Sequence, residues 1–106
     1  MPALAPRDLL ILAVLADGPH HGYGIIKAVE ERSSNGVLLD PANLYRSLRR
    51  MQADGWIDEA RPRAGEDERR RTFRVTAQGR AILSDEVKRL EALLRGLRPT
   101  LTTARR

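Results

Sequence analysis

The chain has 106 residues, of which 42% are hydrophobic and 31% charged, and these proportions are typical of one globular domain rather than of a disordered chain. It contains no cysteine, which excludes a disulfide framework, a thiolate metal site and a cysteine nucleophile. No apolar run approaches the roughly 18 residues that a membrane span needs, and the first residues do not resemble a secretory signal. The composition therefore predicts a cytoplasmic protein without a membrane segment.

The net charge of +5 and the pI of about 10.7 favour an anionic partner, such as nucleic acid or an anionic surface, without choosing between them. Only Lys27 and Lys88 are lysines, and the other 17 basic residues are arginines. The planar fork of arginine suits phosphate and guanine.

The first predicted helix runs from Arg7 or Asp8 to Ala16 and is apolar almost all round. Such a helix must be covered on more than one side, which one small domain can hardly do alone. We therefore expect Leu9 and Leu12 to face a partner subunit.

A second helix is predicted from Gly22 to Arg32, with an apolar stripe of Tyr23, Ile26 and Val29. The adjacent His20 and His21 precede it on a loop. No further ligand stands at the spacing of a metal site, so we interpret both as structural or capping residues.

The third predicted helix begins at Asp40-Pro41, an N-cap followed by a proline at the first helical position, and ends at Asp54-Gly55. Its core stripe is Leu44, Leu48 and Met51, with Tyr45 on the flank. Arginines and small residues gather on the opposite face: Ala42, Arg46, Arg49, Arg50 and Ala53. Such a face fits a DNA major groove, because Arg reaches phosphates or guanine edges and alanine permits close approach. The alternative is a solvated amphipathic surface helix.

Two short strands are predicted next, over residues 56–63 and 69–75, joined by a polar connection at 62–68. Phe73 and Val75 would point inward, and Thr72 and Arg74 outward. The rim of this hairpin carries Arg61, Arg63, Arg69, Arg70 and Arg71. These charges would either protect a sheet edge or grip the DNA backbone or minor groove.

The final predicted helix runs from Ala77 to Arg98, with Thr76 as its cap and Pro99 as its end. Its apolar residues step by 4, 3, 4, 3, the spacing of a coiled-coil seam: Leu83, Val87, Leu90, Leu94 and Leu97. We expect this seam to pair between subunits. Residues 99–106 are predicted to be a flexible basic tail.

The elements together predict a mainly α fold with a small β-hairpin, the order of a winged helix-turn-helix followed by a long dimerisation helix. The expected DNA-binding unit spans residues 1–76 and the dimerisation helix residues 77–98.

Several residues form a pattern at fixed spacing: Leu15, Gly18, Pro19, His21-Gly22-Tyr23, Leu44-Tyr45, Leu48, Met51, Asp54-Gly55-Trp56-Ile57, Arg71, Phe73, Thr76 and Gly79-Arg80. With this pattern the chain resembles the short PadR family of transcriptional regulators over roughly residues 8 to 98. The resemblance implies a homodimer, a winged-helix DNA-binding unit and usually repression of nearby genes. Some relatives release DNA when a small aromatic compound binds near the dimer interface. In this chain Phe73 replaces the more usual tyrosine, and the last helix contains no aromatic residue to stack on such a compound.

The function expected from these patterns is that of a dimeric, sequence-specific regulator, most simply a repressor, bound to an inverted repeat in double-stranded DNA. The expected DNA contacts are Tyr23, Asn43, Tyr45, Arg46, Arg49, Arg50, Arg63, Arg69, Arg70 and Arg71. No cofactor or metal is expected, and a small-molecule effector would follow from the resemblance. The alternative is a winged-helix module for protein interaction or nonspecific architectural DNA binding. An enzyme is not expected, because no nucleophile stands beside a base and no glycine loop suits a phosphate.

Overall fold

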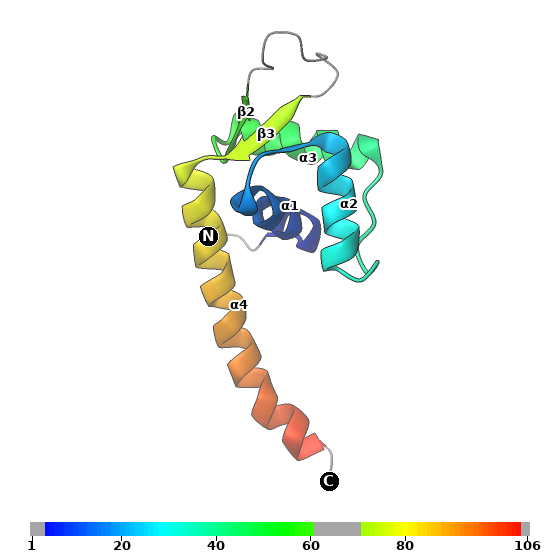
Figure 1. Ribbon diagram of the computed structural model, residues 1–106. Coiled ribbons are helices and arrows are strands. Elements are labelled where there is room, and N and C mark those ends of the chain that lie inside the picture. The colour runs from blue at the N-terminus through cyan, green and yellow to red at the C-terminus, as the bar shows by residue number, and fades with distance from the viewer. Residues whose placement is uncertain (1–3, 61–70, 105–106) are drawn as a thin grey trace.

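The computed structural model describes residues 4–60 and 71–104, and shows a compact head from which one long helix extends (Figure 1). The helices are α1 (Pro6–Asp17), α2 (Gly22–Arg32), α3 (Pro41–Ala53) and α4 (Ala77–Ala104), and the strands are β1 (His20–His21), β2 (Ile57–Ala60) and β3 (Thr72–Val75). Because α4 projects from the head, the molecule measures 63 × 27 × 21 Å along its principal axes.

The sheet is antiparallel, in the order β1-β3-β2. The expected hairpin is present as β2 and β3, with Ile57 opposite Val75 and Ala60 opposite Thr72. Its expected outer ends fall within residues 61–70, which lie outside the described residues. The third strand, β1, was not predicted, because two histidines carry no alternating pattern and pair with β3 only through the fold.

The core lies between α1, α2, α3 and the sheet. Its fully buried members include the predicted stripe of α3, Leu44, Leu48 and Met51. Leu12 also has no exposed surface in the protomer, so its expected place in a dimer interface is wrong: the head covers this side of α1 by itself. Leu9 is only partly buried and keeps some surface for a partner.

The ends of α3 are fixed as the sequence predicts. The Asp40 carboxylate accepts a hydrogen bond from the Asn43 backbone N–H at 2.8 Å. At the other end Gly55 takes a left-handed conformation (φ 80°), and the Trp56 N–H donates to the Met51 carbonyl at 2.9 Å. Both ends of the helix are therefore specified by residues next to it in the chain.

The histidines before α2 are structural, as expected. The His21 ring accepts a hydrogen bond from the Gly24 N–H at 3.1 Å and so caps α2, and the His20 ring contacts the Gly18 carbonyl oxygen at 2.7 Å.

The end of α3, the start of β2 and the start of α4 meet at one joint. The Thr76 hydroxyl donates to the Gly55 carbonyl at 2.6 Å and accepts from the Gly79 N–H at 3.0 Å, which confirms Thr76 as the cap of α4. Gly79 is buried so closely that a Cβ at this position would lie 2.0 Å from the Trp56 carbonyl oxygen. This joint, defined by Gly55, Trp56, Thr76 and Gly79, has no room for a larger residue at 79.

Helix α4 continues through Pro99 to Ala104, so the prediction that Pro99 ends it is wrong. Proline removes one helical hydrogen bond and crowds the preceding turn, but it does not end the helix in this part of α4, which projects from the head (Figure 1). Beyond it, the Thr102 hydroxyl donates to the Arg98 carbonyl at 3.1 Å. The extra turns bring Leu101, four residues after Leu97, onto the predicted seam.

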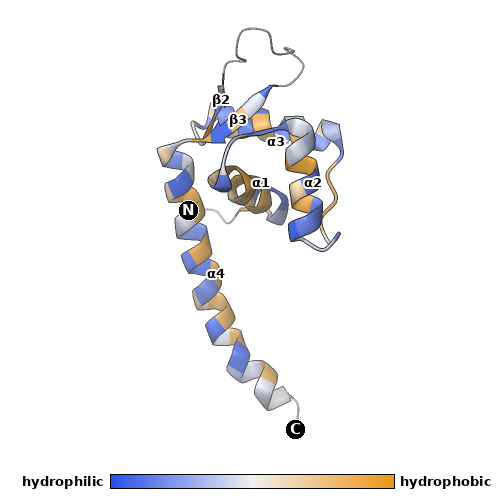
Figure 2. Ribbon diagram, viewed as in Figure 1, coloured by the Kyte–Doolittle hydropathy of each residue, from blue (hydrophilic) through white to orange (hydrophobic). Residues whose placement is uncertain are grey.

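The seam of α4 changes from covered to exposed along its length. Leu83 is partly buried against the core, whereas Val87, Leu94, Leu97 and Leu101 are 40%, 57%, 46% and 67% exposed. Figure 2 shows this apolar stripe running down the projecting part of α4. A long exposed stripe of this kind marks an interaction surface.

Candidate nucleic-acid interface

The outer face of α3 presents arginines to solvent. Arg46 and Arg49 are both exposed, and they alternate with the buried residues Ser47, Leu48 and Met51 on the inner face. The amphipathic pattern of α3 therefore fixes which side of the helix is open, and a guanidinium on that side can reach an outside ligand.

The side chain of Asn43 lies between Asp40 and Arg46. Its Nδ2 donates to the Asp40 carboxylate at 2.9 Å, and its Oδ1 accepts from Arg46 Nη1 at 3.1 Å. Asn43 therefore already has protein partners at both ends of its amide, although we expected it to contact DNA.

Arg50 is also exposed, but unlike Arg46 and Arg49 it has a partner on α1. Its guanidinium pairs with the carboxylate of Asp8 on α1, which is only 7% exposed. The second Asp8 oxygen, Oδ1, is buried without a hydrogen-bond partner in the described part of the chain. The structure thus gives Arg50 a role in joining α3 to α1, while its side chain is 47% exposed and its expected contact with DNA stays a prediction.

Arg71 is held on the sheet by Glu59. Its Nε and Nη2 donate to the two Glu59 carboxylate oxygens at 2.6 and 2.7 Å, and its guanidinium lies 5.5 Å from the centre of the Phe73 ring. These hydrogen bonds lower the pKa of Glu59 and raise the pKa of Arg71. Arg71 is therefore a fixed cation beside α3.

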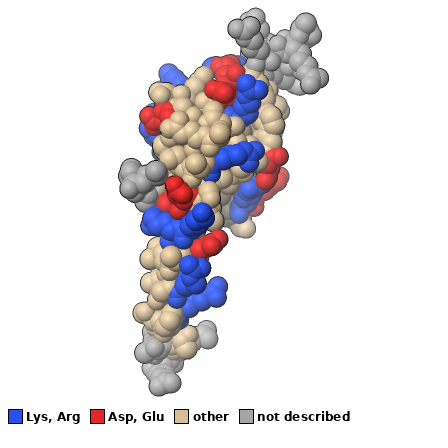
Figure 3. Space-filling model, turned by 90° about the vertical axis from the view of Figure 1, so that its left-hand side faces the viewer, with Lys and Arg blue, Asp and Glu red and all other residues tan. Residues whose placement is uncertain are grey.

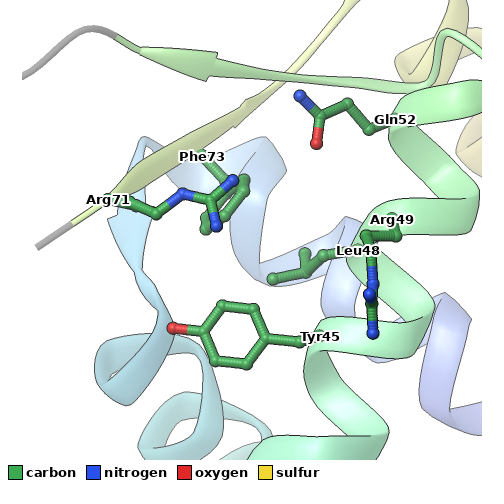
Figure 4. Close-up of a pocket in the computed structure, with 6 residues that line it drawn as sticks. All are labelled: Tyr45, Leu48, Arg49, Gln52, Arg71 and Phe73. Carbon is green, nitrogen blue, oxygen red and sulfur yellow. The ribbon is translucent and has the colours of Figure 1, made fainter. Parts of the chain in front are cut away.

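A pocket of about 400 Å³ separates α3 from β3 (Figure 4). Tyr45, Leu48, Arg49 and Gln52 line it from α3, and Arg71 and Phe73 line it from β3. The Tyr45 ring is half-buried, and its hydroxyl lies so close to Gly22 that a Cβ there would be 2.7 Å from the oxygen. Tyr45 thus packs α3 against the start of α2 and keeps one edge on the pocket.

Tyr23 lies on the surface of α2 and not in the core. Its side chain is 66% exposed, and the Lys27 ammonium lies 5.9 Å from its ring centre. The buried face of α2 is formed by Gly22, Ile25 and Val29, so of the three residues expected in its stripe Val29 is buried and Ile26 only partly so.

The model of the transcriptional regulator PadR-like family matches residues 11–85. The chain belongs to this family.

Two curated relatives and two solved structures place this PadR-like regulator among known proteins. It is 36% identical over 87 residues to a transcriptional regulator from Mycobacterium tuberculosis, covering 82% of this chain and 78% of the relative. It is 40% identical over 86 residues to an uncharacterised transposon protein of Streptomyces fradiae, covering 81% of this chain but only 23% of that longer relative.

The structural neighbours confirm the expected winged-helix fold. A PadR family regulator from Clostridium difficile superposes with a TM-score of 0.78 at 24% identity, over 92% of this chain and 99% of that one. Bacillus subtilis PadR, solved in complex with operator DNA, superposes with a TM-score of 0.66 at 21% identity, over 76% of this chain and 45% of that one. The family is one of transcriptional regulators, in agreement with the expectation that the chain is not an enzyme.

The PadR-like chain brings Tyr45, Arg49 and Arg71 together at the pocket and leaves Arg46 beside Asn43 on the outer face of α3. Arg63, Arg69 and Arg70 lie outside the described residues. Three residues of this region were not singled out from the sequence: Lys27, Gln52 and Glu59. The role of Glu59 could have been inferred from the hairpin. Glu59 pairs with Phe73, and Arg71 lies two residues from Phe73 on the same side of the sheet, where an acidic and a basic side chain can pair.

In the described ranges 4–60 and 71–104, no helix of this PadR-like regulator is both long and apolar enough to cross a membrane. Over the same ranges, no group of three His, Cys, Asp or Glu side chains is placed to hold a metal ion.

Proposed function

We propose that the protein is a dimeric, sequence-specific DNA-binding regulator that works in the cytoplasm and represses its own gene or nearby genes. In this proposal α3 enters the major groove, residues up to 76 form the DNA-binding unit and α4 joins the two subunits. The observation that carries it is the pair of exposed arginines, Arg46 and Arg49, on a helix whose inner face is fixed in the core. An α-helix fits the major groove, and Arg is the side chain that most often reads guanine there.

Cationic and polar side chains near α3 support its proposed role in DNA binding. Arg71, held by Glu59, places a cation across the pocket from α3, and Tyr23 and Lys27 add an exposed phenol and an ammonium on α2. Such groups suit contacts with the DNA backbone, which position a protein without reading sequence.

The exposed seam of α4 supports a second copy of the chain as the partner. On the face seen in Figure 3, Lys and Arg side chains gather along one edge of α4 and uncharged side chains along the other. The exposed seam residues of α4, Val87, Leu94, Leu97 and Leu101, have a coiled-coil spacing, which pairs with an equivalent helix. A dimer would present two copies of α3 to the two halves of an inverted repeat.

A second pocket, of about 410 Å³, lies between the end of α1 and α4 and is where we place an effector. It is lined by Ala16 from α1 and by apolar, polar and charged residues of α4: Arg80, Leu83, Ser84, Val87, Lys88 and Glu91. It adjoins the proposed dimer face, so a ligand there could alter how the subunits pack.

DNA binding is tested by selecting duplexes from a randomised library with the wild-type protein. We expect an inverted repeat to be recovered and to bind at least about 10³-fold more tightly than a scrambled duplex at 150 mM salt. Arg46→Ala and Arg49→Ala should each weaken binding to it about tenfold, because each removes a base or phosphate contact. Fluorescence anisotropy over a salt series measures both effects.

The matched control is Arg95→Ala, which removes the same charge from an exposed position on α4 far from the head. If all three variants lose affinity equally, net charge alone explains the binding and α3 is not the reading element. Recovery of no preferred sequence would favour an architectural DNA-binding role instead.

The subunit arrangement is tested by Leu94→Glu, which places a charge in the middle of the exposed seam. Sedimentation velocity should show that this variant shifts from dimer to monomer, because a buried unpaired carboxylate opposes association. Ala92→Glu is the control, since Ala92 is exposed on α4 about 200° around the helix from Leu94. A dimer that survives Leu94→Glu unchanged would place the interface elsewhere.

A further inference from the structure

The exposed end of α3 carries a ladder of three polar side chains, Asp40, Asn43 and Arg46, each three residues after the one before. The Asp40 carboxylate accepts from both the backbone N–H and the side-chain Nδ2 of Asn43, at 2.8 and 2.9 Å. Asn43 Oδ1 then accepts from Arg46 Nη1 at 3.1 Å. All three side chains lie on the side of α3 that faces solvent.

The carboxylate of Asp40 determines the orientation of the Asn43 side-chain amide. An ionised carboxylate only accepts hydrogen bonds, so the amide of Asn43 must turn its NH₂ group toward Asp40. Its carbonyl oxygen then faces the other way, toward Arg46, which only donates. The orientation of the amide thus follows from its two neighbours.

The bond to Nη1 leaves one edge of the Arg46 guanidinium available. Within the part of the chain that the structure describes, Nε and Nη2 of Arg46 make no hydrogen bond. These two groups form the parallel pair of donors that binds two acceptors on one ligand, such as O6 and N7 of guanine or two phosphate oxygens.

We propose that Asn43 is a positioning residue, which holds Arg46 in the orientation that reads DNA before DNA is bound. The inference rests on the proposed function and names how one of its contacts gains specificity. A long side chain that is free in solution loses rotational freedom when it binds, and a side chain already held loses less. Asn43 therefore contributes to affinity and discrimination through Arg46, without touching DNA.

The first test needs no DNA. In the free protein, the ¹⁵N–¹H heteronuclear NOE of Arg46 Nε should be well above that of the exposed Arg95, and Asn43→Ala should lower it to the Arg95 value. Asn43→Ala should not change the melting temperature, because the Asp40 cap bonds the backbone N–H, which alanine retains. An Arg46 NOE unaffected by Asn43→Ala overturns the proposal.

The second test uses the duplex selected by the wild-type protein. Asn43→Ala should weaken binding about fivefold, the size expected for ordering one long side chain, and should have no further effect in an Arg46→Ala background. Replacing each guanine in turn by 7-deazaguanine should identify one position whose N7 matters to the wild type, matters less to Asn43→Ala and not at all to Arg46→Ala.

Additive effects of Asn43→Ala and Arg46→Ala would overturn the proposal, because they would show that Asn43 contacts DNA independently. Failure of the proposed function is a separate result: the wild type would then select no sequence, while the NOE test would still report whether Asn43 orders Arg46.

Discussion

Replacing Gly79 by alanine is expected to lower the free energy of unfolding by about 3 kcal/mol, the upper end of the usual cost of overpacking. The new Cβ would lie 2.0 Å from the Trp56 carbonyl oxygen, which is backbone and cannot move aside without disturbing β2 or α4. Urea unfolding followed by circular dichroism measures the change, provided that the protein concentration is held constant.

Gly96→Ala is the matched control for this prediction. Gly96 also lies within α4, but a Cβ there would meet no atom within 4 Å apart from its chain neighbours and the nearby backbone of its own helix. The substitution should therefore stabilise the protein by up to about 1 kcal/mol, the difference in helix propensity between glycine and alanine. Equal effects at the two positions would show that the joint beside Trp56 is not rigid.

Replacing Arg50 by alanine is expected to destabilise the protein by about 2 kcal/mol, because the buried Asp8 carboxylate would lose its guanidinium partner. The cost is below that of a wholly buried pair, since the Arg50 side chain is 47% exposed. Asp8→Ala should cost less than Arg50→Ala, because the arginine left behind can turn toward water while a buried carboxylate cannot. Urea unfolding of both single variants and of the double variant measures this asymmetry.

The same variants separate a structural role of Arg50 from a DNA-reading role. If Arg50 joins α3 to α1, the double variant Asp8→Ala, Arg50→Ala should be more stable than Arg50→Ala alone and should keep the sequence preference of the wild type. If both Arg50 variants lost discrimination at one base pair, with little loss of stability, Arg50 would contact DNA in the groove as expected from the sequence.

The parts of this fold that could be predicted from sequence are those that neighbouring residues specify. Asp40, Pro41 and Gly55 mark both ends of α3 through local hydrogen bonds and backbone conformation, and the stripe of α3 follows from helical spacing. The order of the elements followed from the helix and strand patterns along the chain, and the solved structures confirm the winged-helix fold.

The parts that could not be predicted depend on residues far apart in the chain. Strand β1 exists because His20 and His21 pair with Phe73 and Thr72 on β3. The pairing of Asp8 with Arg50 spans 42 positions, so a helical wheel of α3 alone could only place Arg50 with the other arginines. The passage of α4 through Pro99 was not predicted, because a local proline rule does not consider where the helix lies relative to the rest of the fold.

The joint at Gly79 also limits how a signal could reach the DNA. Since α3, β2 and the start of α4 are fixed to one another there, α3 would turn together with the start of α4 in each protomer of the proposed dimer. Regulation would then act on the crossing angle between the two α4 helices. A small rotation of one α4 about its partner would move the α3 of that protomer. The spacing between the two α3 helices would then no longer match the helical repeat of the duplex.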